Sequence, residues 1–484
     1  MKKILLVLLV VVTMIKLPAQ NYAGFNSGNY AGVNSVFFNP ASISDSRYRW
    51  DINLLSVHAG VLNNYAKIKS ADMFKLFSAD SLSKYFTRET QPNVRLMTNV
   101  DIFGPSVLFN ASEKNSFAIT TRLRNHINLI GLDGSLLNLL ENKSQPPTAP
   151  VTLSQNGVAL SSYSWSEIGL SYSRPVIESG VHFIKVGLTL KYLSGLGAGF
   201  LTVNNLQGTL GKQAPDNPYI KSGTGNFNYG FTGKTGFALP SFSSSVGSGI
   251  GTDFGLVYEL RPNLDKYKVS NDELRKDKNK YVLRLGIALK DMGSIKFNKV
   301  APVGGVYKLA TSANTGDTIS LKRFYGIGNF EDLNTAMMKA TPSITKTGSV
   351  GNELIMQLPS TLALDLDLNV GAGFFLNVAG SFMLKNSDQD YQVAGSYNYF
   401  QITPRFESKG FGIYLPITHN AINNYNAGIA LNLGSLFIGS GSLLSTFISG
   451  ETRQLDIHAG FRFGLLQQKN ETNTKTKKKE ETIE

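Results

Sequence analysis

The chain has 484 residues, a formal net charge of +13, 47 glycines and no cysteine. The lack of cysteine excludes a disulfide scaffold, a thiolate metal site and a thiol nucleophile. A basic chain suits nucleic acid or an anionic membrane surface. Because the chain starts like an exported protein, we expect contact with anionic lipid headgroups, or an anion-tolerant interior, and no nucleic acid.

Residues 1–19 have the pattern of a secretory signal peptide. Lys2 and Lys3 precede an apolar run over residues 4–15, and Ala19 supplies the small residue of a cleavage site. This run is shorter than the ~20 residues that a membrane-spanning helix needs, so we expect cleavage rather than an anchor. No long apolar run follows it. The mature chain is therefore either a soluble exported protein or a membrane barrel.

Strict alternation of apolar and polar residues dominates the remaining chain. Alternate side chains of a strand point to opposite faces, so each alternating run has one apolar side and one side of charged or very small residues. Runs of about 9–11 residues match tilted membrane-spanning strands. The clearest runs are residues 182–192, 253–261, 281–290, 360–369 and 455–465.

These runs and weaker ones predict an all-β fold, a transmembrane antiparallel β-barrel of about 14 strands over residues 49–467. A soluble sandwich also alternates, but here the apolar faces are uninterrupted in run after run. Aromatic residues near the run ends suit interfacial girdles: Tyr192, Tyr258, Tyr281, Tyr425 and Phe463. The weaker candidate strands are residues 51–61, 94–111, 115–126, 163–174, 373–384, 391–400, 410–417, 425–433 and 436–441.

Several segments interrupt the strand pattern. Residues 70–88 and 131–140 have helical spacing and are expected to pack on a rim. Long loops are expected at 202–248, which is rich in glycine, asparagine and serine, and at 301–359, with a short helix near 332–339. The polar residues 468–484 are expected to be a disordered tail.

Catalytic and cofactor motifs are incomplete. Lys234 and Thr235 resemble the end of a phosphate-binding loop, but the glycine required at position 228 is an asparagine. The glycines at 247, 249 and 251 precede a strand-like run instead of a helix, which argues against a dinucleotide site. The five histidines lack short metal-ligand spacing, and no G-x-S-x-G elbow occurs. We therefore expect no enzyme activity, cofactor or metal.

Charged residues on the polar faces are the best functional candidates in the expected lumen. Both signs occur, which fits an ion-pair network that fills the lumen, since buried charges must pair. A permeation path would also be lined with charge, so both interpretations remain open. The candidates are Lys185, Lys191, Asp253, Glu259, Arg261, Arg284, Lys290, Asp365 and Asp367.

Short phrases along residues 22–467 resemble outer-membrane barrels of Bacteroidota that form a family of unknown function, which is itself similar to the fatty-acid-channel fold. The first is Asn39-Pro40-Ala41, ahead of the first strand-like run; Asn before Pro favours a turn. Others are FGPS at 103–106, GTDFGLVY at 251–258, LKDMGSIK at 289–296 and LGSLFIG at 433–439.

The resemblance implies that residues 20–48 are a hatch inside the barrel, in the outer membrane of a Gram-negative bacterium. Two functions stay open. A plugged passive channel for small hydrophobic molecules would have an apolar pocket beside the hatch, lined by Phe37 and Phe38, and could use the glycine-rich residues 195–199 as a wall break. A closed accessory or scaffold subunit of an envelope machine (type IX secretion, gliding or outer-membrane assembly) would have a filled lumen and dock partner proteins.

Overall fold

The computed structural model describes residues 24–77, 85–140, 150–213, 217–233, 245–268, 274–311, 318–325, 327, 329–339, 343–385 and 390–467. The expected signal peptide over 1–19, the first residues of the 20–48 segment and the expected tail over 468–484 lie outside this range. Within it, every helix is too short or too polar to span a bilayer.

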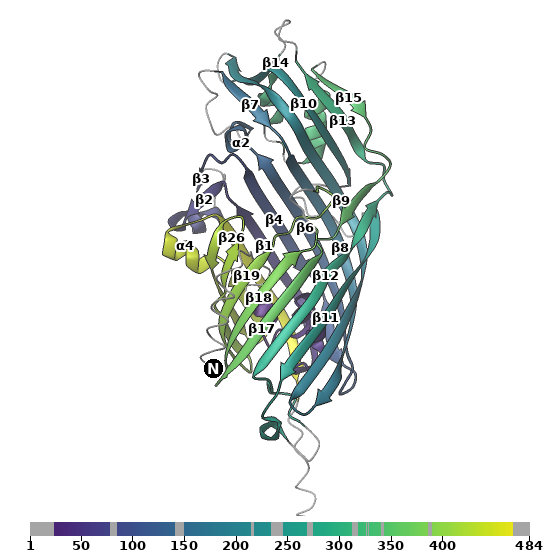
Figure 1. Cartoon of the computed structure of the whole chain (residues 1–484), viewed down its shortest axis with the longest axis vertical. Helices are drawn as coiled ribbons and strands as arrows, with labels where there is room; N and C mark the ends of the chain where they lie inside the picture. The colour runs from purple at the N-terminus through teal and green to yellow at the C-terminus, as the bar shows by residue number, and fades with distance from the viewer. Residues whose placement is uncertain are drawn as a thin grey trace, which may run out of the picture.

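Fourteen antiparallel passes of the described chain close into a barrel (Figure 1). The first and last strands pair from Tyr48 opposite Leu466 to Leu62 opposite Gln454, so the wall has no free edge. The passes are β1 (Tyr48–Asn63), β4 (Val94–Phe103) continued by β5 (Ser106–Asn110), β6 (Ser116–Leu132), β8 (Val158–Ser179), β9 (His182–Gln213), β11 (Gly247–Leu260), β12 (Leu283–Phe297), β17 (Thr361–Gly371), β18 (Phe374–Met383), β19 (Tyr399–Ser408), β20 (Phe411–Tyr414) continued by β21 (Ile417–Asn420), β22 (Asn424–Ala427) continued by β23 (Ile429–Leu433), β24 (Leu436–Ser440) and β26 (Gln454–Leu466).

One side of the wall continues into a tall sheet, called here the extension. It is built on β9, which runs for 32 residues. Its other strands are β7 (Val151–Gln155), β10 (Asn217–Gly233), β13 (Val303–Ala310), β14 (Thr318–Ser320), β15 (Ile344–Gly348) and β16 (Leu354–Gln357). Three short helices accompany it: α2 (Gly134–Leu140), η7 (Leu321–Phe324) and α3 (Phe330–Met338).

The extension corrects the expected loop at 202–248. Its described residues up to 233 lie in β9 and β10, which pair from Asn217 opposite Gln213 to Gly233 opposite Gly197. The glycine and asparagine content suggested a loop, but Phe227, Tyr229 and Phe231 alternate onto one buried face. A paired partner strand therefore outweighs the low strand propensity of the other residues.

Smaller elements lie at the rim beside the extension. A three-stranded sheet consists of β2 (Ala66–Lys69), β3 (Phe86–Arg88) and β25 (Glu451–Thr452), and it is accompanied by η4 (Ser70–Phe77) and α4 (Leu443–Ser449). A further turn, η6 (Leu264–Tyr267), lies between β11 and β12 at the opposite end of the barrel (Figure 1). The expected helices at 131–140 and 332–339 are confirmed as α2 and α3. The one at 70–88 is a 3-10 helix over 70–77 followed, after residues 78–84 outside the description, by β3.

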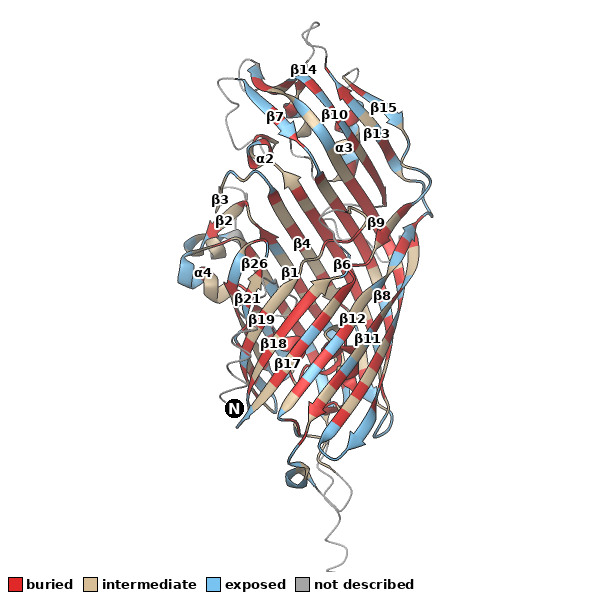
Figure 2. Cartoon of the chain, in the orientation of Figure 1, coloured by how far each residue is buried: buried red, intermediate tan, exposed pale blue. Residues whose placement is uncertain are grey.

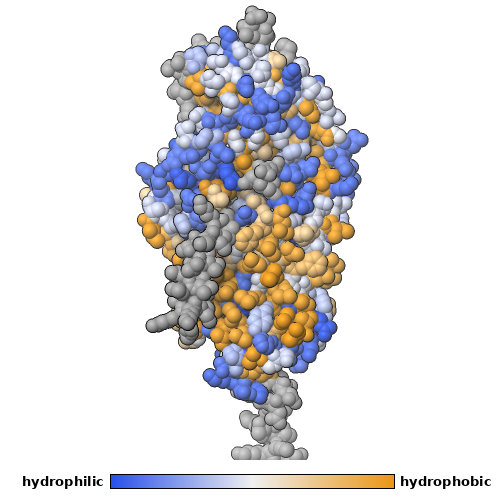
Figure 3. All heavy atoms as spheres, in the orientation of Figure 1, coloured by the Kyte–Doolittle hydropathy of each residue, from blue (hydrophilic) through white to orange (hydrophobic). Residues whose placement is uncertain are grey.

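The wall has an apolar outside and a polar inside, as the alternation predicted. Buried and exposed residues alternate along the barrel strands (Figure 2), and on the face seen in Figure 3 apolar residues gather over the barrel while the extension is more polar. Tyr281 is an exception to the expected girdle: it is buried and donates a hydrogen bond to Asp367. It precedes β12 and points inward. Exposed apolar side chains of the wall include Leu190, Ile250, Phe254, Ile287, Leu364 and Phe461.

The prediction of a strand over residues 391–400 is wrong. Residues 390–398 fold against interior residues of the wall, and β19 begins at Tyr399. The backbone groups of this loop find partners on residue Gln357, and Tyr391 stacks on Phe200 with ring centroids 4.1 Å apart. Tyr163 donates to the Tyr391 carbonyl oxygen at 2.7 Å. These contacts replace the ladder that a strand would have made.

Candidate functional site: the N-terminal segment and the barrel interior

Residues 24–46, called here the N-terminal segment, are buried against the inner wall as three short 3-10 turns. The turns are η1 (Phe25–Ser27), η2 (Gly32–Phe37) and η3 (Pro40–Ile43). Asn39 caps η3, because its side-chain oxygen accepts a hydrogen bond from the Ala41 nitrogen at 2.9 Å. Pro40 occupies the first helical position, where no backbone donor is needed. The Asn-Pro-Ala tripeptide is therefore a defined capped turn.

Three glycines on β9, β11 and β12 form the surface on which this turn lies, called here the glycine seat. A Cβ atom at Gly187 would lie 2.4 Å from the Ala41 nitrogen, and one at Gly255 would lie 2.1 Å from Asn39 Oδ1. At Gly286 the nearest Asn39 atom would be 3.3 Å away. The Asn39 amide donates to the carbonyl oxygens of Leu256 and Ile287, at 3.3 and 3.2 Å. Only a wall without side chains here admits the turn.

Charged wall residues hold the backbone of the segment at both ends and in the middle. Glu407 accepts from the Asn29 nitrogen at 3.1 Å, and Asp51 accepts from the Val33 nitrogen at 2.7 Å. Cations bind its carbonyl oxygens: Arg284 that of Ser27 at 2.7 Å, Lys185 that of Ser44 at 2.9 Å, and Arg462 that of Tyr30. Charge-assisted hydrogen bonds are about twice as strong as neutral ones, so the segment is firmly anchored.

Asp45, near the end of the segment, makes ion pairs with three cationic side chains. Its carboxylate lies 2.6 Å from Arg261, 3.1 Å from Lys280 and 3.1 Å from Arg47. Burial alone would raise the pKa of Asp45, but the positive charges of Lys280, Arg261 and Arg47 outweigh it and hold this pKa well below its usual range. Burial also lowers the pKa of Lys280 to about 8, against the opposing attraction of Asp45.

The lumen charges expected from the sequence are brought together, and eight of the nine make ion pairs with acidic or basic partners. Lys185 and Arg261 flank Glu259, at 3.1 and 2.5 Å. Lys191 lies 2.7 Å from Asp253. Arg284 lies 3.6 Å from both Asp365 and Asp367. The ninth, Lys290, donates to the Phe37 carbonyl oxygen of the segment at 3.4 Å.

A second set of interior charges was not predicted from the sequence. Arg124 on β6 binds Glu167 and Asp291 at 3.0 Å each and Asp101 at 3.3 Å, and its guanidinium lies 4.7 Å from the Trp165 ring centre. Asp291 escaped because it breaks the β12 alternation, with φ at 55°. The i, i+2, i+4 spacing of Arg122, Arg124 and His126 could have revealed this set. Arg405 and Glu407 on β19 share the same signal.

Phe37 and Phe38 lie beside a cavity, but not an apolar one. Its volume is about 50 Å³, and it is lined mainly by charged and polar side chains, among them Arg122, Arg124 and Lys191. The cavity that Phe37 and Phe38 line is therefore polar, whereas the sequence predicted an apolar pocket. The physical reason is that β6, β9, β11 and β12 turn paired charges towards the aromatic residues of the segment.

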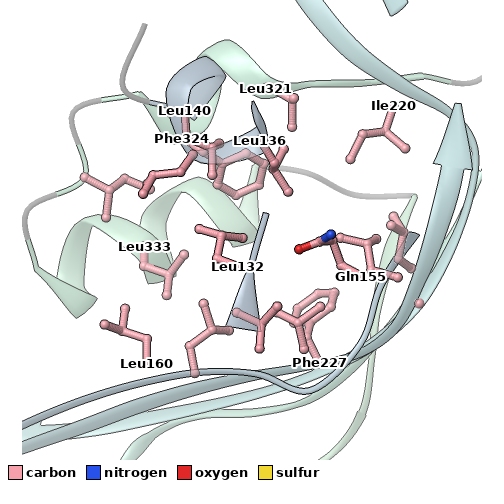
Figure 4. A pocket seen from close by; sticks show the side chains of 18 of the residues that line it. Leu132, Leu136, Leu140, Gln155, Leu160, Ile220, Phe227, Leu321, Phe324 and Leu333 are labelled. Atoms are coloured by element: carbon pink, nitrogen blue, oxygen red, sulfur yellow. The ribbon is translucent and has the colours of Figure 1, made fainter. Parts of the chain in front are cut away.

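A large apolar pocket lies instead in the extension (Figure 4). Its volume is about 780 Å³, and leucines from α2, β6, β8 and α3 point into it. The amide of Gln155 is already bonded, since its oxygen accepts from the Asp133 nitrogen at 2.8 Å and its nitrogen donates to the Ser154 oxygen at 2.8 Å. Concave apolar cavities of this size are typical of small-molecule sites. Labelled lining residues are Leu132, Leu136, Leu140, Leu160, Ile220, Phe227, Leu321, Phe324 and Leu333.

An apolar layer lies below the extension. It contains Trp165, Leu193, Phe297 and Met356, all completely or almost completely buried, and residue Tyr391 of the inserted loop packs against it. Trp165 also contacts Arg124 of the charge network. The interior is thus layered, with the N-terminal segment and paired charges in the barrel and apolar packing towards the extension.

A closed antiparallel wall with an apolar exterior and a charged interior defines an outer-membrane-type β-barrel. The chain belongs to a family of unknown function, DUF5723, whose model matches residues 40–441. A search of curated proteins found no match.

Solved structures similar to this chain share very little sequence with it. A FadL homologue of Pseudomonas aeruginosa is 9% identical, with 93% of this chain and 98% of that chain covered and a TM-score of 0.39. The toluene transporter TbuX of Ralstonia pickettii is 9% identical, with 90% and 94% covered and a TM-score of 0.38. The monoaromatic hydrocarbon channel CymD is 9% identical, with 90% and 94% covered and a TM-score of 0.33.

Proposed function

We propose that this protein is a plugged passive channel for small hydrophobic molecules in the outer membrane of a Gram-negative, Bacteroidota-like bacterium. The N-terminal segment is its hatch, and the apolar pocket of the extension receives the ligand. The channel needs no cofactor and carries out no chemistry. Its partners are outer-membrane lipid and the ligand.

The observation that carries this proposal is the pocket. Apolar side chains line it almost entirely, in a part of the molecule whose surface is largely polar on the face seen in Figure 3. Apolar surface removed from water contributes roughly 25 cal/mol per Å². A compact lipophile that fills the pocket therefore gains free energy from the burial of its apolar surface, which opposes the cost of association.

Pocket filling tests ligand capture. The variant Leu333→Trp, on α3, places an indole in the pocket. The matched variant Met338→Trp adds the same ring at a position of the same helix that is 70% exposed. We expect Leu333→Trp to weaken binding of the neutral dye N-phenyl-1-naphthylamine to protein in nanodiscs at least tenfold. Met338→Trp should bind like the unchanged protein. Equal binding by both variants would refute capture in this pocket.

Removal of the hatch tests transport. Protein lacking residues 22–46 should conduct ions in planar bilayers, while the intact chain stays closed to ions and takes up labelled lipophile into vesicles. Because this deletion removes several buried ion pairs, Gly255→Val serves as a second variant that keeps the whole chain. Absence of uptake by the intact chain, in vesicles where the barrel is folded, would refute the channel.

The layered interior favours a second candidate, a closed barrel that serves as an accessory or scaffold subunit of an envelope machine such as type IX secretion, gliding or outer-membrane assembly. Eight of the nine expected lumen charges make ion pairs, and the extension offers a large surface above the wall. This function predicts that cross-linking in cells captures envelope proteins on the extension. It also predicts that neither the intact chain nor the hatch deletion conducts.

A further inference from the structure

α4 is a rigidly held helix that exposes its most apolar side chains. Phe447 is 53% exposed and Ile448 82% exposed, while Thr446 on the opposite side is completely buried. The helix lies beside the upper ends of the wall strands, at the base of the extension (Figure 1). A soluble rim element would be expected to turn such residues inward, so their outward position calls for an apolar surrounding.

Hydrogen bonds fix α4 at both of its ends. Asp456 on β26 accepts from the Gly441 nitrogen and, at 2.7 Å, from the Ser442 hydroxyl, which fixes the start of the helix. At its other end, the Gly450 carbonyl oxygen accepts from the Ser70 nitrogen at 2.9 Å. The orientation of Phe447 and Ile448 is therefore set by the fold.

The exposed face of α4 continues the lipid-facing surface of the wall. The helix packs beside β22, whose Tyr425 is 74% exposed, and β26 adds Ile457, which is 49% exposed. Aromatic and aliphatic residues at this height mark the boundary between acyl chains and headgroups. Lys69, exposed on β2 next to β25, adds a cation where lipid phosphates lie.

We propose that α4, with Tyr425, is a lipid-docking element that lies in the leaflet on the extension side of the membrane, with Phe447 and Ile448 among the acyl chains. The occupant of this face is lipid, because the face is continuous with the wall surface that lipid already covers. Since β25 pairs with β2 and β2 with β3, the same element fixes Phe86, which lines the apolar pocket, at the membrane surface.

The chain has no cysteine, so single-cysteine spin labels test this directly. Ile448→Cys and Phe447→Cys, labelled with a nitroxide, are placed in vesicles of phosphatidylethanolamine and phosphatidylglycerol. Collision rates with oxygen, which concentrates in acyl chains, are compared with those of a water-soluble nickel chelate. Phe254→Cys on the wall is the lipid control, and Met338→Cys on α3 is the water control.

We expect the labels on α4 to collide at least threefold more with oxygen than with the nickel chelate, as at position 254. A preference for the chelate, as at position 338, would overturn the proposal. Low collision rates with both reagents, together with dipolar broadening between labels, would show a second copy on this face and would overturn it equally.

Discussion

Asp45 is a carboxylate with three cationic partners, two of which come from distant parts of the chain. Arg47 is two residues away, Arg261 follows β11, and Lys280 precedes β12. Such a group joins the N-terminal segment to the wall more tightly than any single apolar contact would. Removal of one member of a buried ion pair costs about 3–5 kcal/mol, because the remaining charges lose their partner.

Asp45→Asn should therefore loosen the segment. The variant Ser44→Cys, buried next to Asp45, reports the loosening through its reaction with a membrane-impermeant maleimide. We expect Asp45→Asn to raise the labelling rate about 100-fold, which corresponds to ~3 kcal/mol. Ser112→Cys, exposed in the β5–β6 turn, should label at the same rate in both backgrounds. An unchanged rate at position 44 would mean that Asp45 does not hold the segment.

The depressed pKa of Asp45 also fixes the direction of a pH effect. In the undocked segment this carboxyl titrates near 3.8, and in the docked segment well below it. The undocked state therefore binds more protons in this window, so docking is weakened as the pH falls below about 4 and is unaffected by this group above that.

In planar bilayers, opening events should be equally rare at pH 7 and pH 5 and should increase at pH 3. Asp45→Asn should open more often than the unchanged chain at pH 7 and should lose the part of the pH response that belongs to this group. An increase between pH 7 and pH 5 that persists in Asp45→Asn would assign the response to another carboxylate.

At this scale, the sequence predicted which strand residues face the lumen better than it predicted what they contact. Lys185, Glu259 and Arg261 alternate visibly with apolar neighbours, because strand periodicity is a local property. Their pairing with each other and with Asp45 depends on register between strands far apart in the chain. Asp291 was invisible, because its left-handed backbone conformation places it off the alternating pattern.

The glycine seat is an element-scale feature, in which three neighbouring strands together leave room for one turn. Gly187, Gly255 and Gly286 lie on β9, β11 and β12, and each is unremarkable in its own strand. Their joint effect is a flat patch in a wall that otherwise carries charged side chains. A methyl group would meet the backbone of the turn at Gly187, the Asn39 side chain at Gly255 and the Asp365 carboxylate at Gly286.

Gly255→Ala should therefore displace the Asn-Pro-Ala turn, since the new Cβ would lie 2.1 Å from Asn39 Oδ1. Overpacking of this kind costs typically 1–3 kcal/mol, so we expect a 10- to 100-fold rise in labelling at Ser44→Cys. Gly348→Ala is the control, because its Cβ meets nothing closer than 3.4 Å and the residue lies on β15. Equal labelling in both variants would show that the seat does not position the turn.

Elements were predictable where periodicity alone decides them. The runs at 182–192 and 455–465 lie within observed strands, and the run at 253–261 lies in β11 except for Arg261, because alternation is visible without knowledge of the partner. The segment at 391–400 alternates too, yet it folds inward, since Tyr391 and Ala394 pack in an apolar layer and Val393 forms a bridge with Gln357. The length of β9 also could not be foreseen, because its pairing with β10 on one side and with β7 and β8 on the other keeps residues 202–213 extended.

At the scale of the whole molecule, closure depends on the pairing of the first and last strands. β26 pairs with β1 as far as Leu466, so the wall is complete before residue 468. Truncation after residue 467 should leave a barrel that resists dodecyl sulfate without heating and migrates faster than the heated form.

Truncation after residue 456 removes Ala459, Phe461 and Phe463 from that seam and should abolish the heat-shifted band. It also removes Arg462, the partner of Asp51. A folded barrel without these residues would mean that β1 and β24 can close the wall alone.

The burial of the N-terminal segment has a consequence for biogenesis. Glu407 and Arg462, which bind the segment, follow their partners Asn29 and Tyr30 by 378 and 432 residues. Contacts over such sequence separations form late, because the intervening chain must first be ordered. The interior therefore cannot be completed strand by strand from the N-terminus. A nascent barrel therefore stays open until its final hairpins have formed. Binding of the N-terminal segment to the inner wall is then the step that completes folding.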